Sequence, residues 1–327
     1  MKRSIRYAAL VMAAAMAMSA CSKEPEATAS ETDPAQAETT VAETTAAETE
    51  ATETEAEVTE ATEAPTPTPL PPIEDPNIEP PEGYYLVWHD EFEDGSQLNS
   101  NDWEWETWEK GNVNNEQQYY RPGSQTIDGR HTTEIKNGNL YINCFKATDG
   151  KIYSGRVNAK NGGKGWQYGY FEARMLLPKG KGTWPAYWMM PITVDWTNEG
   201  WPKCGEIDIM EEVGCVPNEV SSSLHSEGHN HTNGTQVSKA RNIGTAESEY
   251  HVYALEWTAD YIKTYVDGVE LLSYKSDHTV RNYPYDKPFH LIFNLAWGGS
   301  WGGMYGTDES ALPVTMKVDY IRVFQKK

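Results

Sequence analysis

Short runs of alternating apolar and polar residues fill the chain from about residue 83 to the C-terminus. Successive side chains of a β-strand point to opposite faces, so each run predicts a strand with one buried face. Gly, Asn, Asp and Pro separate the runs, and Asp267-Gly268 between two of them predicts a two-residue hairpin turn. The clearest runs are residues 139–145, 167–177, 250–257, 261–266, 269–274, 289–297 and 314–325.

This part of the sequence has no sustained helical periodicity and no internal repeat. Many short strands over residues 83–327 predict one all-β domain, in which two antiparallel sheets pack as a sandwich. The 12 Trp and 19 Tyr residues of the chain are more than such a core needs. Aromatic side chains with a polar edge suit a groove that stacks sugar rings, although core packing accounts for at least half of them.

The N-terminus has a different pattern. Three basic residues precede an apolar run over residues 7–18, and Met18-Ser19-Ala20-Cys21 ends it, which predicts an export signal over residues 1–21. This segment resembles the signal of bacterial lipoproteins, in which the cysteine is lipidated. The resemblance implies lipidation at Cys21 and an extracellular, membrane-anchored protein, whereas an ordinary signal peptide is the alternative.

Residues 22–82 are rich in Thr, Glu, Ala and Pro, with 17 acidic residues and one basic residue. This composition cannot bury enough apolar surface to fold, so it predicts a disordered, extended linker. A tail that recruits a partner is the alternative. The formal net charge of the chain is −22, of which about −9 belongs to residues 83–327. A mildly acidic domain argues against nucleic acid as a partner, and we expect a monomer.

Besides Cys21, the chain has Cys144, Cys204 and Cys215. Eleven residues of extended chain would separate Cys204 from Cys215 by roughly 35 Å, which is far beyond disulfide reach. The spacing fits no zinc site either, so we expect buried free thiols.

Three carboxylates interrupt an apolar, β-prone run at Glu206, Asp208 and Glu211. In a regular strand Glu206 and Asp208 share one face, and Glu211 lies on the other. A one-residue bulge near Met210 would return Glu211 to the face of the other two acids. The alternative is a solvated strand whose acids, Glu212 included, simply face water.

Paired carboxylates suit the cleavage of glycosidic bonds, where one is the nucleophile and the other the acid and then the base. Retaining enzymes hold the two carboxyl groups about 5 Å apart. A regular strand would place the Cα atoms of Glu206 and Glu211 about 16 Å apart on opposite faces, and a bulge about 13 Å apart on one face. Like charges packed together would keep at least one carboxyl group protonated near neutral pH.

The run over residues 205–211 resembles the signature of glycoside hydrolase family 16, in the bulged form that its laminarinase branch carries. The resemblance covers about residues 84–327. It implies a β-jelly-roll with a concave sheet and a retaining endo-β-1,3-glucanase that acts on laminarin-like glucans. Further matching motifs occur at residues 86–92, 114–120, 168–174, 182–191, 224–225, 293–296 and 318–323.

The resemblance also implies roles for single residues: Glu206 as nucleophile, Asp208 as its support and Glu211 as acid/base. From the residues alone, Trp188 and His225 could instead belong to the core, and Arg156 could merely balance the acids. By family position, the residues expected to line the groove or to hydrogen-bond sugar hydroxyls are Asn115, Glu116, Arg156, Trp184, Trp188, Trp201, His225, Asn294 and Trp301.

Family members often hold a structural calcium ion on the convex side, and no cofactor is expected for catalysis. Asp319 shares strand parity with Ile321, which predicts an inward face where a cation would satisfy the carboxylate. Backbone oxygens near Glu91 and Gly138 would complete the calcium site. A salt bridge from Asp319 to a nearby basic residue is the alternative.

The sequence departs from the family at Glu212, where an aromatic or amide residue is usual, and at Trp297. Neither departure touches the three acids, but variation in the loops that rim a groove leaves the linkage preference open. The alternatives are mixed-linkage β-1,3-1,4-glucan and, with less support from the acidic domain, a galactan. A non-catalytic glycan-binding jelly roll would be expected to have lost one of the three acids, and all are present.

Overall fold

The computed structural model describes residues 69–93 and 95–327. The expected signal peptide, Cys21 and most of the expected linker lie outside these residues. Within them, no helix has the length and apolarity needed to cross a membrane.

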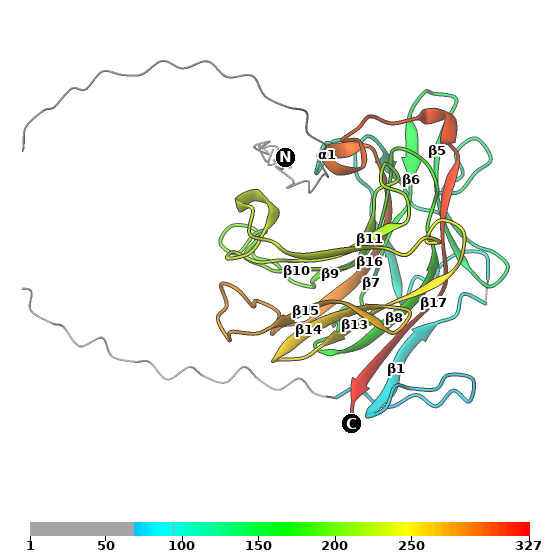
Figure 1. The fold of residues 1–327 in the computed structure, drawn as a ribbon. Helices are drawn as coiled ribbons and strands as arrows, with labels where there is room; N and C mark the ends of the chain where they lie inside the picture. The colour runs from blue at the N-terminus through cyan, green and yellow to red at the C-terminus, as the bar shows by residue number, and fades with distance from the viewer. Residues whose placement is uncertain (1–68, 94) are drawn as a thin grey trace, which may run out of the picture. The chain divides into compact units, whose positions relative to one another are not determined.

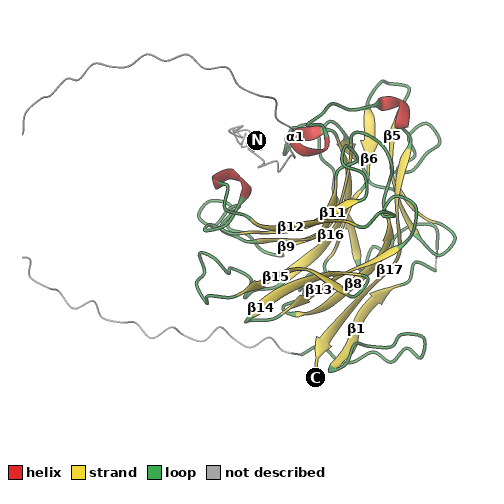
Figure 2. Ribbon diagram, viewed as in Figure 1, coloured by secondary structure: helices red, strands yellow, loops and turns green. Residues whose placement is uncertain are grey.

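Two β-sheets are stacked as layers, and nearly all connections are loops (Figures 1 and 2). The ten-stranded sheet runs in the order β15 (Val269–Lys275), β14 (Tyr261–Val266), β13 (His251–Trp257), β8 (Gly169–Leu176), β17 (Val314–Lys326), β5 (Leu140–Lys146), β6 (Ile152–Ser154) and β3 (Tyr119–Tyr120). In the same sheet β1 (Tyr84–Asp90) pairs with β17, and β4 (Thr133–Ile135) pairs with β5.

The seven-stranded sheet runs in the order β12 (Val237–Asn242), β11 (Glu219–His225), β10 (Glu206–Glu212), β9 (Thr183–Pro191), β16 (Phe289–Trp297), β7 (Arg156–Ala159) and β2 (Trp103–Trp105). The helical elements in the described part of the chain are one short α-helix, α1 (Gly299–Gly302), and two 3₁₀ turns, η1 (His231–Asn233) and η2 (Glu309–Ala311). The predicted all-β sandwich is therefore confirmed.

The predicted hairpin is also confirmed. Asp267 and Gly268 connect β14 to β15, and their φ angles are 51° and 74°. Two successive residues with positive φ are typical of a type I′ turn, whose twist matches that of the flanking strands. Aspartate tolerates this backbone region better than most residues, and glycine has no Cβ to clash there.

The core lies between the two sheets. Tyr187 of β9 stacks on Phe293 of β16 with ring centroids 4.9 Å apart, and both side chains are fully buried. Full burial of one such side chain contributes about 1.5–3 kcal/mol. The ten-stranded sheet supplies the opposite layer, which includes Phe171, Ala173 and Met175 from β8 and Val318, Ile321 and Val323 from β17.

The chain just before β1 packs on the ten-stranded sheet. The backbone amide of Ile73 donates to the carbonyl of Leu86 at 2.8 Å. Ile78 is buried in a small apolar cluster with Leu86 and Phe324. The contacts of the folded part thus extend N-terminal to residue 83, where we expected the domain to begin.

The three cysteines in the described part of the chain are free, so the prediction that Cys204 and Cys215 form no disulfide is confirmed. Cys144 and Cys204 are buried as expected, whereas Cys215 is half-buried.

Candidate active site

Strand β10 contains the predicted bulge. Its register with β9 skips Ile209, because Asp208 pairs with Trp188 whereas Met210 pairs with Tyr187, the residue just before Trp188. The register with β11 shifts at the same place. One extra residue in a strand reverses the face of every side chain that follows it.

The bulge brings the three acids to one face. Ile207 and Met210 point into the core, where both are fully buried. Glu206, Asp208 and Glu211 therefore lie on the outer face of the seven-stranded sheet, away from the core. Without the bulge, Glu211 would occupy the core side instead.

His225 of β11 lies beside the first two acids. Its Nε2 atom is 3.1 Å from Asp208 Oδ2 and 3.8 Å from Glu206 Oε1. The ring is 5% exposed, and it belongs to the outer face because its neighbour Leu224 points into the core. The structure therefore places His225 with the acids and not in the core.

Glu211 has a different partner. The indole Nε1 of Trp184 donates a hydrogen bond to Glu211 Oε1 at 2.9 Å. The ring of Trp301, on α1, meets Trp184 edge to face with centroids 5.6 Å apart. Two of the expected tryptophans thus lie at the Glu211 end of the acid cluster.

Burial raises the pKa of all three carboxyl groups. The neighbouring charge of Asp208 raises the pKa values of Glu206 and Glu211 further. His225 is the one basic side chain within 4.0 Å of any of these acids among the described residues. Such a cluster retains a proton near neutral pH, as a general acid requires.

Arg156 belongs to a separate group on the same face. Its guanidinium lies 4.1 Å from the ring centroid of Trp108 and 4.8 Å from that of Trp188. Its Nε donates to Glu106 at 2.6 Å, and Asn158 donates to the same carboxylate at 2.6 Å. Arg156 is thus paired with Glu106, and not with the three acids of β10.

A chain of hydrogen bonds continues from Trp188. Its Nε1 donates to Asn294 at 2.7 Å, and the amide of Asn294 donates to the hydroxyl of Tyr120 at 3.1 Å. The Tyr120 hydroxyl in turn donates to Glu116 at 3.3 Å, and Gln118 donates to Glu116 at 2.6 Å. Trp188 is only half-buried, and this chain fixes its ring on the outer face.

Loops approach this face from both ends of β9. At one end, the loop that carries exposed Asn115 contacts α1, because the amide of Ser300 donates to the carbonyl of Asn114 at 2.7 Å. At the other end, the ring of Trp201 packs 5.7 Å from that of His225 and 4.9 Å from that of His231. The expected groove residues are therefore gathered around one face.

Glu106 and Trp108 were missed by the sequence reasoning. A usable signal lies in Trp103-Glu104-Trp105-Glu106-Thr107-Trp108, where aromatic residues alternate with acids. This alternation gives one face aromatic side chains and the other carboxylates, and β2 ends at Trp105, before Glu106 and Trp108.

The sequence model for glycosyl hydrolases family 16 matches residues 99–322. The chain belongs to this family. The β-glucanase of Rhodothermus marinus is 37% identical over 247 residues, covering 73% of this chain and 85% of the relative.

Solved structures agree with the family assignment. The laminarinase of Rhodothermus marinus superposes with a TM-score of 0.69 at 35% identity, covering 75% of this chain and 98% of that structure. SCLam, a non-specific endo-β-1,3(4)-glucanase, superposes with a TM-score of 0.68 at 36% identity. The match covers 76% of this chain and 94% of that structure. This family 16 glycoside hydrolase thus has the jelly-roll fold of laminarinases.

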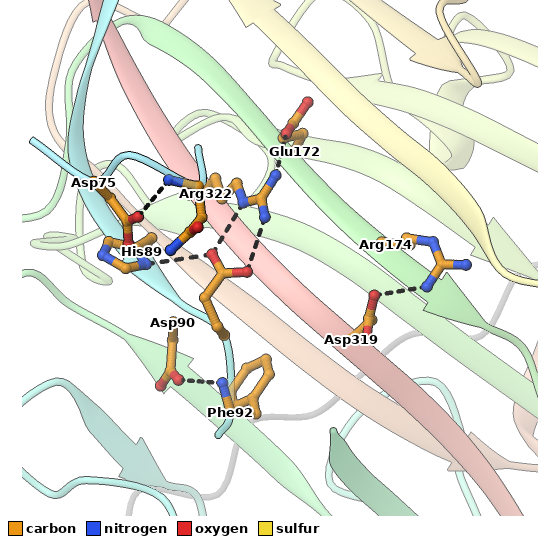
Figure 3. A network of polar contacts seen from close by, with 10 residues as sticks. Asp75, His89, Asp90, Phe92, Glu172, Arg174, Asp319 and Arg322 are labelled. Atoms are coloured by element: carbon orange, nitrogen blue, oxygen red, sulfur yellow. Dashed lines mark hydrogen bonds and ion pairs between the residues drawn. The ribbon is translucent and has the colours of Figure 1, made fainter. Parts of the chain in front are cut away.

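Asp319, the side chain expected to bind a calcium ion, pairs with a basic residue of the neighbouring strand β8 (Figure 3). The Asp319 carboxylate lies 2.6 Å from Arg174, and the Glu91 carboxylate accepts two hydrogen bonds of 2.9 Å from Arg322. The predicted inward face of Asp319 is wrong, because a register shift in β17 between Val318 and Tyr320 leaves the side chain half-exposed.

The Asp319 carboxylate is thus paired with Arg174, and the calcium site with backbone oxygens near Glu91 and Gly138 stays a prediction. Gly138 lies in the turn between β4 and β5 with a φ of 67°. The ion pair between Asp319 and Arg174 is the alternative that the sequence left open.

Glu212, the departure from the family pattern, is fully buried behind the acid cluster. Its Oε1 accepts a hydrogen bond from the amide of Asn218 at 2.7 Å, but its Oε2 has no hydrogen-bond partner in the described part of the chain. Burial raises the pKa of Glu212 to about 8, and the nearby carboxylate of Glu247 contributes to the shift. A carboxyl group whose pKa is raised on folding stabilises the fold below its unfolded pKa, and this contribution is lost as the pH rises towards 8.

Replacing Glu212 with Gln should raise the melting temperature in a pH-dependent way. The neutral amide removes the cost of ionising a buried group, so we expect an increase of about 5 °C or more at pH 8 and less than about 2 °C at pH 4. The melting temperatures at the two pH values can be measured by thermal unfolding, monitored by circular dichroism. The matched control is Glu219→Gln at an exposed position of β11, which should leave the melting temperature unchanged; an equal shift at both pH values would contradict the account.

Replacing Trp184 with Phe should lower kcat by about tenfold to a hundredfold, because a hydrogen bond to a charged group contributes about 1.5–3 kcal/mol. The ring is kept and only the donor to Glu211 is lost. Steady-state kinetics on laminarin provide the measurement. Trp301→Phe is the control, since Trp301 contacts Trp184 but makes no hydrogen bond to Glu211, and it should change KM more than kcat.

Proposed function

We propose that this family 16 glycoside hydrolase is a retaining endo-β-1,3-glucanase. The observation that carries the proposal is the bulge at Ile209, which gathers Glu206, Asp208 and Glu211 on one face of β10. Two carboxyl groups on one face are what double displacement requires. The aromatic side chains around them supply surfaces on which sugar rings can stack.

In the first step, Glu211 donates its proton to the glycosidic oxygen while the Glu206 carboxylate attacks the anomeric carbon. The bond to the leaving sugar breaks, and a glycosyl ester on Glu206 forms. Asp208 lies between the two residues in sequence, and its Oδ2 atom is 3.1 Å from His225 Nε2. The hydrogen bond from Trp184 orients Glu211 towards the same face.

In the second step, the Glu211 carboxylate removes a proton from water, and this water attacks the anomeric carbon from the face that the leaving sugar vacated. The ester bond to Glu206 breaks, and the product keeps the β configuration. Two inversions at one carbon therefore give net retention. Proton NMR of the first product should show the β anomer, and an initial α anomer would reject this mechanism.

We propose Arg156, Trp188, Asn294 and Glu116 as substrate contacts. All four belong to the connected networks on the outer face, where hydrogen bonds hold their polar groups in position. Burial raises the pKa of Glu116. Hydrogen bonds that neighbouring side chains donate to its carboxylate lower the pKa and partly offset this effect. A pre-ordered polar surface reduces the entropy that a flexible glucan must lose in binding. Trp201 and Asn115 would extend this surface at its two loop borders.

The similarity to laminarinases favours β-1,3-glucan as the substrate, and the similarity to a non-specific endo-β-1,3(4)-glucanase favours mixed-linkage glucan as the second candidate. Incubation of the chain with laminarin, lichenan and agarose, followed by product sizing, separates these options. We expect oligosaccharides of several lengths from laminarin and none from agarose. Release of reducing ends from none of the three would overturn the proposal.

We also propose that Cys21 carries a lipid that anchors the enzyme on the outside of a bacterial membrane. The support is the export signal and the small residues before the cysteine. Cys21→Ser should release the protein from the membrane fraction, and unchanged fractionation would contradict lipidation.

A further inference from the structure

We propose that Glu206, Asp208 and His225 form a binding site for a zinc ion, and that zinc bound there reversibly inhibits the enzyme. The inhibitory part rests on the proposed function, because the ion would occupy the carboxylate that we propose as nucleophile. The binding part rests on geometry alone. No metal is needed for the double displacement, so this site would regulate the reaction and not support it.

The three side chains are spaced for a metal ion. One ligand atom from each lies within 4.8 Å of the other two. His225 Nε2 is 3.1 Å from Asp208 Oδ2 and 3.8 Å from Glu206 Oε1. Zinc bonds to nitrogen and oxygen are about 2.0–2.2 Å long, so two ligands of one ion lie at most about 4.3 Å apart. The three ligand atoms, all within 4.8 Å of one another, therefore exceed this limit by at most about 0.5 Å.

Buried atoms that lack partners point to a ligand at this place. Asp208 is 4% exposed, and within residues 69–93 and 95–327 its Oδ2 atom makes no hydrogen bond, although His225 Nε2 lies close to it. The two atoms are near enough but are not aligned as donor and acceptor. A buried carboxylate oxygen without a partner is costly, and a cation placed between these atoms would satisfy it.

The donor set selects the kind of ion. One imidazole nitrogen and two carboxylate oxygens suit zinc, which accepts three protein ligands and a water molecule. Calcium and magnesium prefer six or more oxygen ligands, which this site does not offer. The remaining ring nitrogen, His225 Nδ1, is buried and has no acceptor among the described residues. Loss of that outer hydrogen bond costs about 10–100-fold in metal affinity, which favours reversible binding.

Bound zinc would block the first step of the reaction. Coordination draws on the same lone pair with which the Glu206 carboxylate attacks the anomeric carbon. The ion and its water would also occupy space beside Asp208 that the reacting sugar needs. Zinc should therefore compete with substrate, so that the apparent KM for laminarin rises at least tenfold at saturating zinc while kcat changes little.

Isothermal titration calorimetry of the full chain with zinc chloride tests the site directly. We expect one saturable site that calcium chloride and magnesium chloride do not fill. Asp208→Asn keeps the side-chain shape, His225→Gln replaces the ring with a neutral polar chain, and each should weaken zinc binding at least tenfold. The matched control is His278→Ala, which removes an exposed histidine that also lies beside an aspartate, Asp260, at 3.8 Å.

The control should bind zinc and hydrolyse laminarin as the original chain does. Zinc affinity that is unchanged in both Asp208→Asn and His225→Gln would overturn the site. Hydrolysis of laminarin without a saturable zinc isotherm would overturn this inference and leave the proposed function intact. Zinc binding at these residues in a chain that hydrolyses no glucan would uphold the site and overturn the proposed function.

Discussion

Replacing Glu206 with Gln should abolish turnover of laminarin almost completely, with a loss of kcat on the order of 10⁴-fold or more. The amide has nearly the same shape as the carboxylate, but it cannot form the glycosyl ester. Burial already raises the pKa of Glu206, so a neutral group at this position carries no desolvation penalty. We therefore expect the melting temperature of the variant to equal or exceed that of the original chain.

The matched control for this variant is Glu212→Gln, six residues further along the same strand. It makes the same chemical change at a fully buried position that we exclude from the outer face. Steady-state kinetics on laminarin should show near-normal kcat for Glu212→Gln. Comparable losses in the two variants would mean that the effect is structural and would contradict the role of Glu206.

Replacing Glu211 with Ala should lower kcat on laminarin by about 10²–10⁴-fold, because protonation of the leaving sugar is lost. The defect should depend on the leaving group. An aryl β-oligoglucoside with an acidic phenol needs no proton to depart, so its first step should be nearly as fast in the variant as in the original chain.

Pre-steady-state kinetics separate the two steps for Glu211→Ala. A burst of released phenol followed by slow turnover is expected, since Glu206 still forms the ester while no base activates the water. Glu206→Gln should give no burst with the same substrate. Equal losses on laminarin and on the aryl glucoside would contradict the assignment of Glu211 as acid/base.

The acid cluster could be predicted from the sequence because strand parity is a strict constraint. Glu206 and Asp208 share a face in any strand, and the mismatch of Glu211 left a bulge as the one local solution that unites the three. The structure shows that bulge, with Ile209 as the residue that the register skips. The hairpin at Asp267-Gly268 was predictable for a similar reason, since its backbone requirement favours few residue types.

The same parity argument failed for Asp319. The apolar residues of β17 do mark the register shift, because Val314, Met316 and Val318 share one parity whereas Ile321 and Val323 share the other. The prediction compared Asp319 only with the residues that follow it. The pairing of Asp319 with Arg174 depends on which strands become neighbours, here β8 and β17. Likewise, the partner of Arg156 is Glu106, and no local pattern relates two residues that are 50 positions apart.

The central claim is that the bulge places a nucleophile, Glu206, and an acid/base, Glu211, on one face of one strand. Azide trapping with an aryl β-oligoglucoside tests both roles in one measurement. In Glu206→Ala, azide should attack the anomeric carbon directly and give the α-glycosyl azide after one inversion. In Glu211→Ala, azide should attack the anomeric carbon of the glycosyl ester on Glu206 and give the β-glycosyl azide after two inversions. The reverse pair of anomers, or the same anomer from both variants, would contradict the account.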